Sequence, residues 1–461
     1  MTTLLADRPA AALPVDTAST RADADVYARR RERFLEAIGK GVAVLCAATE
    51  HLKSRDTESE WRQDSDLFYL TGFSEPEAVA VFNPHDANAR FTLFVRPRNP
   101  EREVWDGPRA GPEGVVADHG ADAAYPIEEL DEKLKPMLEH ADALWYALGS
   151  NAEMDERVVS LIRGWRFSRA RSGKWPVDVR DPGTLLDAWR LVKEPGELEK
   201  IRAAARLSAR AHVAAMRMAR PGVGEWELAA RIDGIFRAVA PDAYPAYRSI
   251  VGSGPNAGIL HYVLNHRRAE DGELVLIDAG AELEMYCGDI TRTFPVSGRF
   301  TAPQRAVYDV VLEALEAAIA TVRPGARVDA PHEAARRVLV RGMVDLGLLE
   351  GDVDALLEGE EFKKFFMHQT SHWLGMDVHD SGMYREADGE WLVLRPGMVL
   401  TVEPGLYIAR DAEGVPDELR GIGVRIEDDV IVTEDGCEII TRDVPVRPEE
   451  VEALVGADYR E

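Results

Sequence analysis

Short apolar runs mark the first 150 residues of the chain, and runs of this length are typical of buried strands. They lie at residues 42–48, 67–73, 78–82, 91–95 and 143–149. A loop rich in Gly, Pro and charged residues, from Arg98 to Gly114, separates the fourth run from the fifth. The pattern predicts one compact α/β domain over residues 27–185. Residues 1–26 lack periodicity and are expected to form a flexible tail.

The second half of the chain predicts long helices in two similar sets. One helix is expected to begin at Pro195, because proline is tolerated in the first turn, and to continue through Arg220 until a Pro-Gly pair stops it. A helix–RPG–helix pattern at 205–235 recurs at 307–340. This repeat predicts two similar α/β halves that are related by a pseudo-twofold axis and share a site between them, although RPG is also an ordinary helix terminator. We therefore predict an α/β (α+β) protein whose second domain covers residues 186–461.

The run LVLIDAGAELEMYCGDITRTFPV, residues 274–296, predicts a β-hairpin in which two acids face each other. Asp278 and Asp289 are symmetric about Leu283–Glu284, so a two-residue turn there would place their Cβ atoms roughly 4.5–5.5 Å apart. Leu-Glu is not a favoured hairpin turn, and a bulge could shift the register. Two carboxylates that face each other on a buried sheet need a shared proton or a cation between them. Alternatively, one of these acids simply ends its strand.

Three later segments, residues 367–380, 399–407 and 423–432, carry further acids and histidines on or beside apolar strands. Each has an ordinary interpretation as half-buried histidines, an acid at a strand end, or a solvated strand face. Together, however, they add a second pair of carboxylates and an imidazole, with no thiolate. Carboxylate oxygens with a single histidine suit hard or borderline divalent metals such as manganese, cobalt or zinc.

Long ordered stretches of the chain resemble the Xaa-Pro aminopeptidases (aminopeptidase P), which have the pita-bread metallopeptidase fold. The resemblance extends from about Tyr27 to the C-terminus, and it implies a creatinase-like N-terminal domain followed by a catalytic pita-bread domain. Besides the hairpin, the strongest matches are RQDSDLFYLTGFSEPEAV (62–79), IVGSGPNAGILHY (250–262), SHWLGMDVHD (371–380), GMVLTVEPGLYI (397–408) and RGIGVRIEDDVIVT (420–433).

This resemblance implies that five residues hold two divalent metal ions, which we expect to be Mn²⁺. The implied ligands are Asp278, Asp289, His372, Glu403 and Glu427. In the family pattern Asp289 and Glu427 bridge both ions. Asp278 completes the shell of one ion, and His372 with Glu403 completes the other.

The resemblance also implies the catalytic groups around the metals. His261 and His379 match histidines that contact the substrate and the tetrahedral intermediate, and Glu403 is expected to pass a proton to the leaving proline nitrogen. Arg425 is expected to orient the carboxylates. His368 matches another histidine close to the site, although it could equally be a packing residue.

Three further residues are expected to bind the substrate: Trp105, Asp56 and Tyr407. The resemblance implies that Trp105 reaches the cleft of a neighbouring subunit, where its ring would pack against the substrate's proline. A tryptophan in a charged loop also has an ordinary role as a local packing anchor.

The chain departs from the family pattern at two places. Gln369–Thr370 stand where many relatives have glycine and an apolar residue, which could alter the shape near His368. Cys287 stands where a small residue is usual, and we expect its side chain to share the sheet face of Asp289. The simpler expectation for this thiol is packing as a small hydrophobe.

The resemblance predicts hydrolysis of the N-terminal Xaa-Pro bond in peptides with proline second. An Xaa-Pro dipeptidase (prolidase) of the same fold remains an alternative, because the two differ only in how the site limits peptide length. Creatinase-like hydrolases lack the metal ligands. A non-catalytic binding module of the same fold would also usually lack ligands that are present here.

Composition restricts where such a protein works and what it binds. The chain has 55 Lys plus Arg against 81 Asp plus Glu, a net charge of −26, which makes nucleic acids and anionic membranes poor partners. Three scattered cysteines fit a reducing compartment. The N-terminus lacks the basic and apolar regions of a signal peptide, and no apolar run is long enough for a membrane helix. We expect a cytoplasmic homo-oligomer, a dimer or a tetramer.

Overall fold

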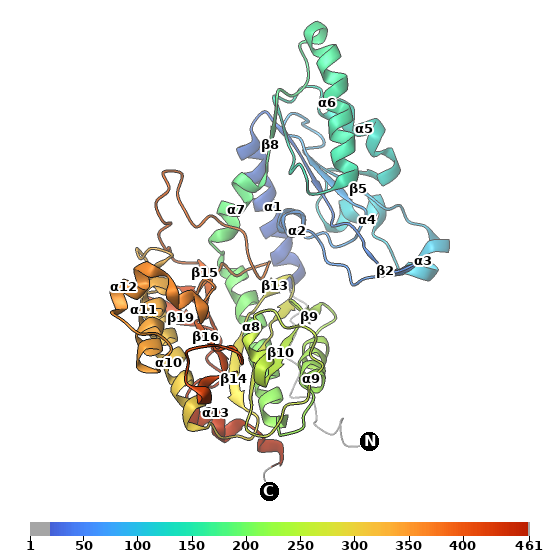
Figure 1. Ribbon diagram of the computed structural model, residues 1–461. Coiled ribbons are helices and arrows are strands. Elements are labelled where there is room, and N and C mark those ends of the chain that lie inside the picture. Colours follow the sequence, from blue (N-terminus) through green and yellow to red (C-terminus); the bar gives the residue numbers. More distant parts are fainter. Residues whose placement is uncertain (1–18, 460–461) are drawn as a thin grey trace. The chain divides into compact units, whose positions relative to one another are not determined.

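The computed structural model describes residues 19–459, and these divide into two compact units, residues 19–186 and 187–459 (Figure 1). Helix α7 (Gly183–Leu191) crosses this boundary. Of the predicted tail, residues 1–18 lie outside the described residues. Residues 19–26 form the start of helix α1 (Ser19–Ile38), so the tail was predicted too long. Arg21, Ala22 and Ala24 favour a helix by propensity even without a clear apolar period.

The N-terminal unit is built on one six-stranded mixed sheet in the order β6-β5-β4-β1-β7-β8. Four of the five predicted runs form its strands. The sheet consists of β1 (Val42–Cys46), β4 (Val79–Phe82), β5 (Phe91–Val95), β6 (Ala123–Pro126), β7 (Ala143–Trp145) and β8 (Asp178–Arg180). Helices α5 (Leu130–Met137) and α6 (Ala152–Ser172) bury Leu134 and Met154 in a core shared with strand residues such as Val81.

The remaining run, residues 67–73, is a helix rather than the predicted strand. Helix α2 (Ser65–Thr71) begins after Asp64, whose carboxylate accepts a hydrogen bond from the Leu67 amide at 2.9 Å. It ends at Gly72, which has a φ of +63°. These are the cap at the start and the left-handed glycine at the end that a helix favours. A short apolar run does not by itself distinguish a buried helix from a buried strand.

The predicted loop from Arg98 to Gly114 also contains helical structure. Helix α3 (Pro100–Asp106) has the Asn99 side chain at its N-cap and proline in its first turn, and α4 (Gly111–Asp118) follows. Trp105 therefore lies on a short helix, where it is 83% exposed. A small hairpin of β2 (Leu52–Ser54) and β3 (Thr57–Glu58) precedes these helices in the chain.

The C-terminal unit has two helix pairs with strands between them (Figure 1). The pairs are α8 (Pro195–Met218) with α9 (Glu225–Arg237), and α10 (Ala302–Ile319) with α11 (Ala330–Asp345). The helix that begins at Pro195 is confirmed, as is the repeated helix–RPG–helix pattern. Each pair packs into its own apolar core. The site-bearing strands therefore lie between two similar helical layers.

The strands of this unit form several small sheets. They are β9 (Ala243–Pro245), β10 (Ile250–Ser253), β11 (Leu274–Asp278), β12 (Ala281–Leu283), β13 (Tyr286–Cys287), β14 (Thr291–Pro295), β15 (Val399–Val402), β16 (Gly405–Tyr407), β17 (Gly423–Arg425), β18 (Asp428–Val432) and β19 (Cys437–Ile439). Helices α12 (Val353–Gly359) and α13 (Pro448–Leu454) complete it. In one sheet β11 pairs with both β10 and β14, and in another β18 pairs with β15 and β19.

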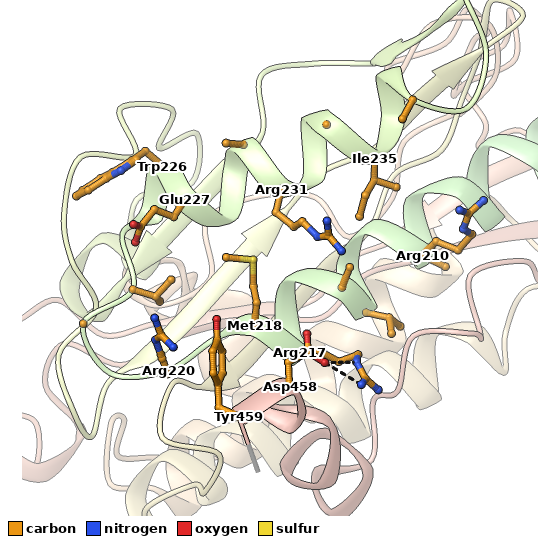
Figure 2. A pocket seen from close by; sticks show the side chains of 18 of the residues that line it. Arg210, Arg217, Met218, Arg220, Trp226, Glu227, Arg231, Ile235, Asp458 and Tyr459 are labelled. Atoms are coloured by element: carbon orange, nitrogen blue, oxygen red, sulfur yellow. Dashed lines mark hydrogen bonds and ion pairs between the residues drawn. The ribbon is translucent and has the colours of Figure 1, made fainter. Parts of the chain in front are cut away.

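An open groove of about 1470 Å³ lies along α8 and α9 (Figure 2). Several arginines line it, among them Arg217, which pairs with Asp458, and Arg268, which pairs with Glu227. None of the predicted site residues lines this groove. This groove is therefore not the predicted site.

Candidate metal centre

The predicted hairpin of residues 274–296 forms, but its turn lies one residue later than predicted. Leu283 pairs with Tyr286, so the turn residues are Glu284 and Met285, with φ of 51° and 68°. A two-residue type I′ turn requires such left-handed values at both positions. Contacts with α8 also hold this register, because Lys200 pairs with Glu284 at 3.0 Å. The sequence pattern alone carries no information about that tertiary contact.

The corrected register still brings the two hairpin acids together. Asp278 pairs with Thr291 instead of Asp289, so the prediction of directly opposed acids was wrong. The partner moves by two positions, however, and a two-residue change leaves every side chain on its original face of the sheet. Asp278 and Asp289 are therefore diagonal neighbours, and the hydroxyl of Tyr247 contacts an oxygen of each.

Two glycines let the hairpin fold back closely behind these acids. A Cβ atom on Gly280 would lie 1.7 Å from the carbonyl oxygen of Gly288. A Cβ atom on Gly288 would lie 3.0 Å from the Ser208 hydroxyl oxygen and 3.1 Å from the backbone of Ala205. The close approach of Gly280 and Gly288 therefore excludes any side chain at the first position, and it packs the second tightly against α8.

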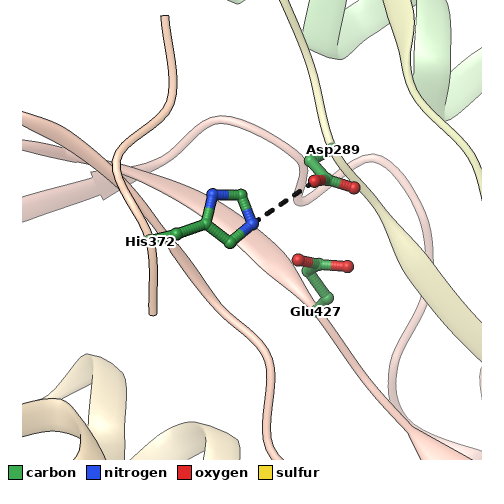
Figure 3. Close-up of side chains that lie close together, drawn as sticks. All are labelled: Asp289, His372 and Glu427. Atoms are coloured by element: carbon green, nitrogen blue, oxygen red, sulfur yellow. Dashed lines mark ion pairs between the residues drawn. The ribbon is translucent and has the colours of Figure 1, made fainter. Parts of the chain in front are cut away.

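Asp289, His372 and Glu427 form the centre of the site (Figure 3). One ligand atom from each lies within 4.8 Å of the others. The Nε2 atom of His372 is 3.5 Å from Asp289 and 3.8 Å from Glu403. Its Nδ1 atom lies 3.0 Å from the carbonyl oxygen of Trp373, which directs Nε2 toward the acids. In its neutral form this imidazole would direct the Nε2 lone pair toward the same space as the carboxylate oxygens.

Three acids in and beside this centre, Glu427, Asp278 and Glu403, have raised pKa values. Burial and the charge of neighbouring carboxylates raise the pKa of Glu427 well above its ordinary value. Burial likewise raises the pKa of Asp278, and it raises the pKa of Glu403 to about 7. Burial alone would lower the pKa of His372, but the hydrogen-bonded carboxylate of Asp289 raises it to about 9. Each shift shows excess negative charge in a desolvated space.

These residues fit a divalent metal site. Four carboxylates, those of Asp278, Asp289, Glu403 and Glu427, interact in one buried region. The single hydroxyl proton of Tyr247 can be donated to only one of its two acid neighbours at a time. A cation shared by the acids would remove this conflict. Oxygen ligands with one imidazole suit manganese, cobalt or zinc.

Removing metal should make the stability of the protein depend on pH in a specific direction. Because the pKa values of Glu403 and His372 are raised in the folded protein, protonation of these two groups stabilises the fold at low pH. This contribution is lost as pH rises through about 7 for Glu403 and about 9 for His372. We therefore expect the melting temperature of chelator-treated protein to fall between pH 5 and pH 8 relative to that of metal-loaded protein. Scanning calorimetry of both forms measures this, and parallel pH profiles would contradict it.

A chain of hydrogen bonds connects Arg425 to two of the acids and to a further histidine. Arg425 donates to Asp278 at 2.5 Å, to the Thr291 hydroxyl at 3.1 Å and to the Tyr407 hydroxyl at 3.2 Å. The Thr291 hydroxyl donates to Glu427 at 2.6 Å. Arg425 therefore contacts one predicted ligand directly and a second one through Thr291, a partner that the sequence analysis missed. The orienting role of Arg425 stays a prediction.

The chain continues from Tyr407 to His368. Their side chains meet at 2.9 Å, and the other ring nitrogen of His368 lies 2.7 Å from the Gln369 carbonyl oxygen. Burial lowers the pKa of His368 to about 4, so its ring is neutral and accepts the Tyr407 proton at Nε2. His368 is 3.8 Å from Glu403. The structure thus brings His368 and Tyr407 into the site, and their roles stay predictions.

The other two predicted histidines also lie near this centre. The rings of His372 and His379 are 4.5 Å apart. Partial desolvation and the neighbouring His372 lower the pKa of His379, and the exposed His261 contributes in the same direction. His261 also contributes to the low pKa of His368. A neutral imidazole of this kind can donate one N–H to a developing oxyanion.

Buried charges anchor the segment that carries His379. The next residue, Asp380, lies 2.9 Å from Lys193 and 2.6 Å from Arg190, and the side chains of all three are at most 4% exposed. Burial alone would raise the pKa of Asp380, but the two cations hold it below its ordinary value. Arg190 also pairs with the half-exposed Asp377 at 2.6 Å.

Two of the remaining residues belong to the N-terminal unit, and the third is a buried cysteine of the hairpin. Trp105 and Asp56 are exposed residues of the N-terminal unit, and their roles stay predictions. Cys287 is 1% exposed, and its thiol lies 3.3 Å from the Met376 carbonyl oxygen, as expected for a packing residue. Tyr247 was missed because no pattern distinguishes one tyrosine in a loop from another.

Comparison with known proteins identifies the class. The metallopeptidase family M24 matches residues 199–434, and the aminopeptidase P N-terminal domain matches residues 27–145. The chain therefore belongs to the M24 metallopeptidases with the pita-bread fold, which confirms the predicted fold class and shows that the protein is an enzyme.

Individual relatives place it more closely. The chain is 44% identical to an Xaa-Pro aminopeptidase of Escherichia coli, over 94% of this chain and 97% of that protein. It is 35% identical to human Xaa-Pro aminopeptidase 3, over 93% and 85%. Among solved structures it matches aminopeptidase PepP of Pseudomonas aeruginosa with a TM-score of 0.92 and 49% identity, covering 95% and 99% of the chains. Zinc-substituted E. coli aminopeptidase P in complex with product matches with a TM-score of 0.90 and 43% identity, over 95% and 99%.

Proposed function

We propose that this enzyme releases the N-terminal residue from peptides whose second residue is proline, using two divalent metal ions. The observation that carries the proposal is the convergence of Asp289, His372 and Glu427, with Glu403 and Asp278 beside them, in one buried acidic centre. The Xaa-Pro aminopeptidases, which the chain matches over most of their length, support the choice of substrate.

The five ligand residues would divide between the two ions as the family pattern implies. Asp289 and Glu427 are central and would bridge both ions, Asp278 would complete one, and His372 with Glu403 would complete the other. When bound, two such ions supply hydroxide near neutral pH and stabilise negative charge on the attacked carbonyl oxygen. We expect Mn²⁺ to restore the activity of chelator-treated enzyme better than Co²⁺ or Zn²⁺.

The protein's own groups would perform the proton transfer and the charge stabilisation. The proline nitrogen has no N–H in the substrate, so it must gain a proton as it leaves. Glu403 would take a proton from the attacking water and pass it to that nitrogen. Its carboxylate lies 3.8 Å from both His368 and His372. His379 and His261 would donate N–H groups to the carbonyl oxygen as it gains negative charge.

Peptide length separates this function from that of a dipeptidase. A dipeptidase needs a cation that binds the carboxylate directly after proline, whereas an apolar rim accepts a continuing chain. We expect Arg-Pro-Pro to be cleaved with a higher kcat/KM than Gly-Pro by the manganese enzyme. A clear preference for Gly-Pro would replace the proposal with its alternative, the Xaa-Pro dipeptidase.

Trp105 is the rim residue that this proposal uses. If its exposed ring packs against substrate in an oligomer, Trp105→Ala should raise KM for Arg-Pro-Pro several-fold and leave metal content unchanged. Val104, 81% exposed on the same helix, offers the control Val104→Ala, which should leave KM unchanged. Equal KM values for the two variants would remove Trp105 from the site.

The proposal includes a cytoplasmic homo-oligomer, a dimer or a tetramer. Within residues 19–459, no helix is long and apolar enough to cross a membrane. The charge of −26 and the free cysteines support a reducing, non-membrane setting. Light scattering after size exclusion measures the number of subunits directly.

A further inference from the structure

A single buried carboxylate organises the segment that carries His261. Glu225, in the first turn of α9, is 1% exposed. Its Oε1 accepts hydrogen bonds from the Ser253 amide at 2.7 Å, the Ser253 hydroxyl at 2.7 Å and the Asn256 side chain at 3.1 Å. Its Oε2 accepts from the Tyr262 hydroxyl and the Arg267 amide, both at 2.9 Å. All five donors belong to residues 253–267.

This segment has little regular structure to hold it. A short 3₁₀ helix covers Gly254–Gly258, and residues 259–267 belong to neither a helix nor a strand. His261 is exposed, and in the described part of the chain no hydrogen bond holds its imidazole. Its neighbour Tyr262 is 4% exposed and donates to Glu225. The position of His261 therefore depends on the backbone that Glu225 anchors.

The chemistry of the anchor requires a carboxylate. Hydrogen bonds to an ionised acceptor are shorter and stronger than neutral ones, and five donors satisfy a charge that would otherwise be costly to bury. A glutamine in the same place would present an amide N–H₂ to one set of donors. The backbone amides of Ser253 and Arg267 cannot reverse their direction, so one of these bonds would be lost whichever way the amide points.

We propose that Glu225 is a positioning residue for His261 in the peptidase reaction. This inference rests on the proposed function, because it assigns His261 a contact with the reacting carbonyl. Glu225 itself touches neither substrate nor metal in this scheme. It acts by keeping residues 253–267, and with them the His261 imidazole, in one place beside His379 and His368.

A double-mutant cycle with Arg-Pro-Pro tests the assignment. We expect Glu225→Gln to lower kcat on the order of 10²-fold, the cost of a displaced catalytic group, with metal content unchanged. His261→Ala should lower kcat by about 10²–10³-fold. The double variant should be no slower than His261→Ala, because residues that act through one another are not additive. Multiplying effects, or a Glu225→Gln enzyme as fast as wild type, would overturn the proposal.

Glu227→Gln is the matched control. Glu227 lies two residues further along α9, is exposed, and accepts from the Gly224 amide at 2.6 Å. It should retain wild-type kcat. If Glu225→Gln does not fold, Tyr262→Phe removes one of the five hydrogen bonds and keeps the aromatic ring. We expect this variant to lower kcat by less than Glu225→Gln, and its effect should again not add to that of His261→Ala.

Hydrogen exchange separates this inference from the proposed activity. Glu225→Gln should speed amide exchange in residues 259–267 by at least about tenfold, and Glu227→Gln should not. Faster exchange in an enzyme that cleaves no Xaa-Pro peptide would support the anchor and refute the function. Unchanged exchange would refute the anchor whatever the activity.

Discussion

Asp289→Asn should empty the metal centre and abolish activity. Asp289 approaches His372 at 3.5 Å, shares the centre with Glu427 and, if it bridges, contributes to both ions. Asparagine keeps the shape but removes the charge that a divalent cation requires. We expect the loss of both metals and a fall in kcat/KM for Arg-Pro-Pro of more than about 100-fold. Removing a residue that only supports a metal ligand lowers activity by at most about 100-fold, so a larger fall indicates a ligand. Elemental analysis and kinetics measure these effects.

A control must show that the loss of metal and activity does not arise simply from removing one negative charge from the protein. Glu434 is an exposed acid two residues beyond the end of β18. Glu434→Gln changes the net charge by the same amount and should leave metal content and kcat/KM unchanged. Full metal occupancy in Asp289→Asn would count against a bridging role.

Asp380→Asn should produce the largest loss of stability. It leaves Lys193 and Arg190 buried, with a neutral amide in place of the carboxylate that compensates them. Removing one partner of a buried ion pair costs about 3–5 kcal/mol. At roughly 2–4 °C per kcal/mol, the melting temperature should fall by roughly 6–20 °C. The variant is measured by calorimetry with metal bound.

Asp377→Asn is its matched control. Asp377 contacts the same Arg190 at the same 2.6 Å, but its side chain is 38% exposed, so water can solvate what remains. Exposed pairs contribute about 0–1 kcal/mol, and the melting temperature should change little. Similar losses in both variants would show that the burial of Asp380 does not set the stability.

The sequence predicted those elements whose local pattern was unambiguous. Alternating or continuous apolar residues marked β1 and β5, and Pro195 marked the start of α8. The apolar run 67–73 failed as a strand because the decisive signals were a capping Asp64 and a left-handed Gly72, not hydrophobicity. Local periodicity predicts an element well only when its length excludes the alternative.

The metal centre could be predicted only in part, because its residues come together from distant parts of the chain. The resemblance supplied ligands that lie far apart in the chain, and the structure brings together Asp289, His372 and Glu427. Partners such as Tyr247 and Glu225 act through single side-chain contacts across the fold. Such contacts leave no periodic trace in the sequence, and neither does the contact with α8 that fixes the hairpin register.

The close approach of Gly280 and Gly288 restricts which substitutions this enzyme can accept in its hairpin. Neither glycine carries a functional group, yet a methyl group at position 280 would collide with the opposite strand and push apart the two acids on either side. Random mutagenesis of the hairpin should therefore recover no active clone that carries a side chain at position 280. Metal preference can therefore be engineered by changing the ligand residues, but not by changing the backbone shape of the hairpin.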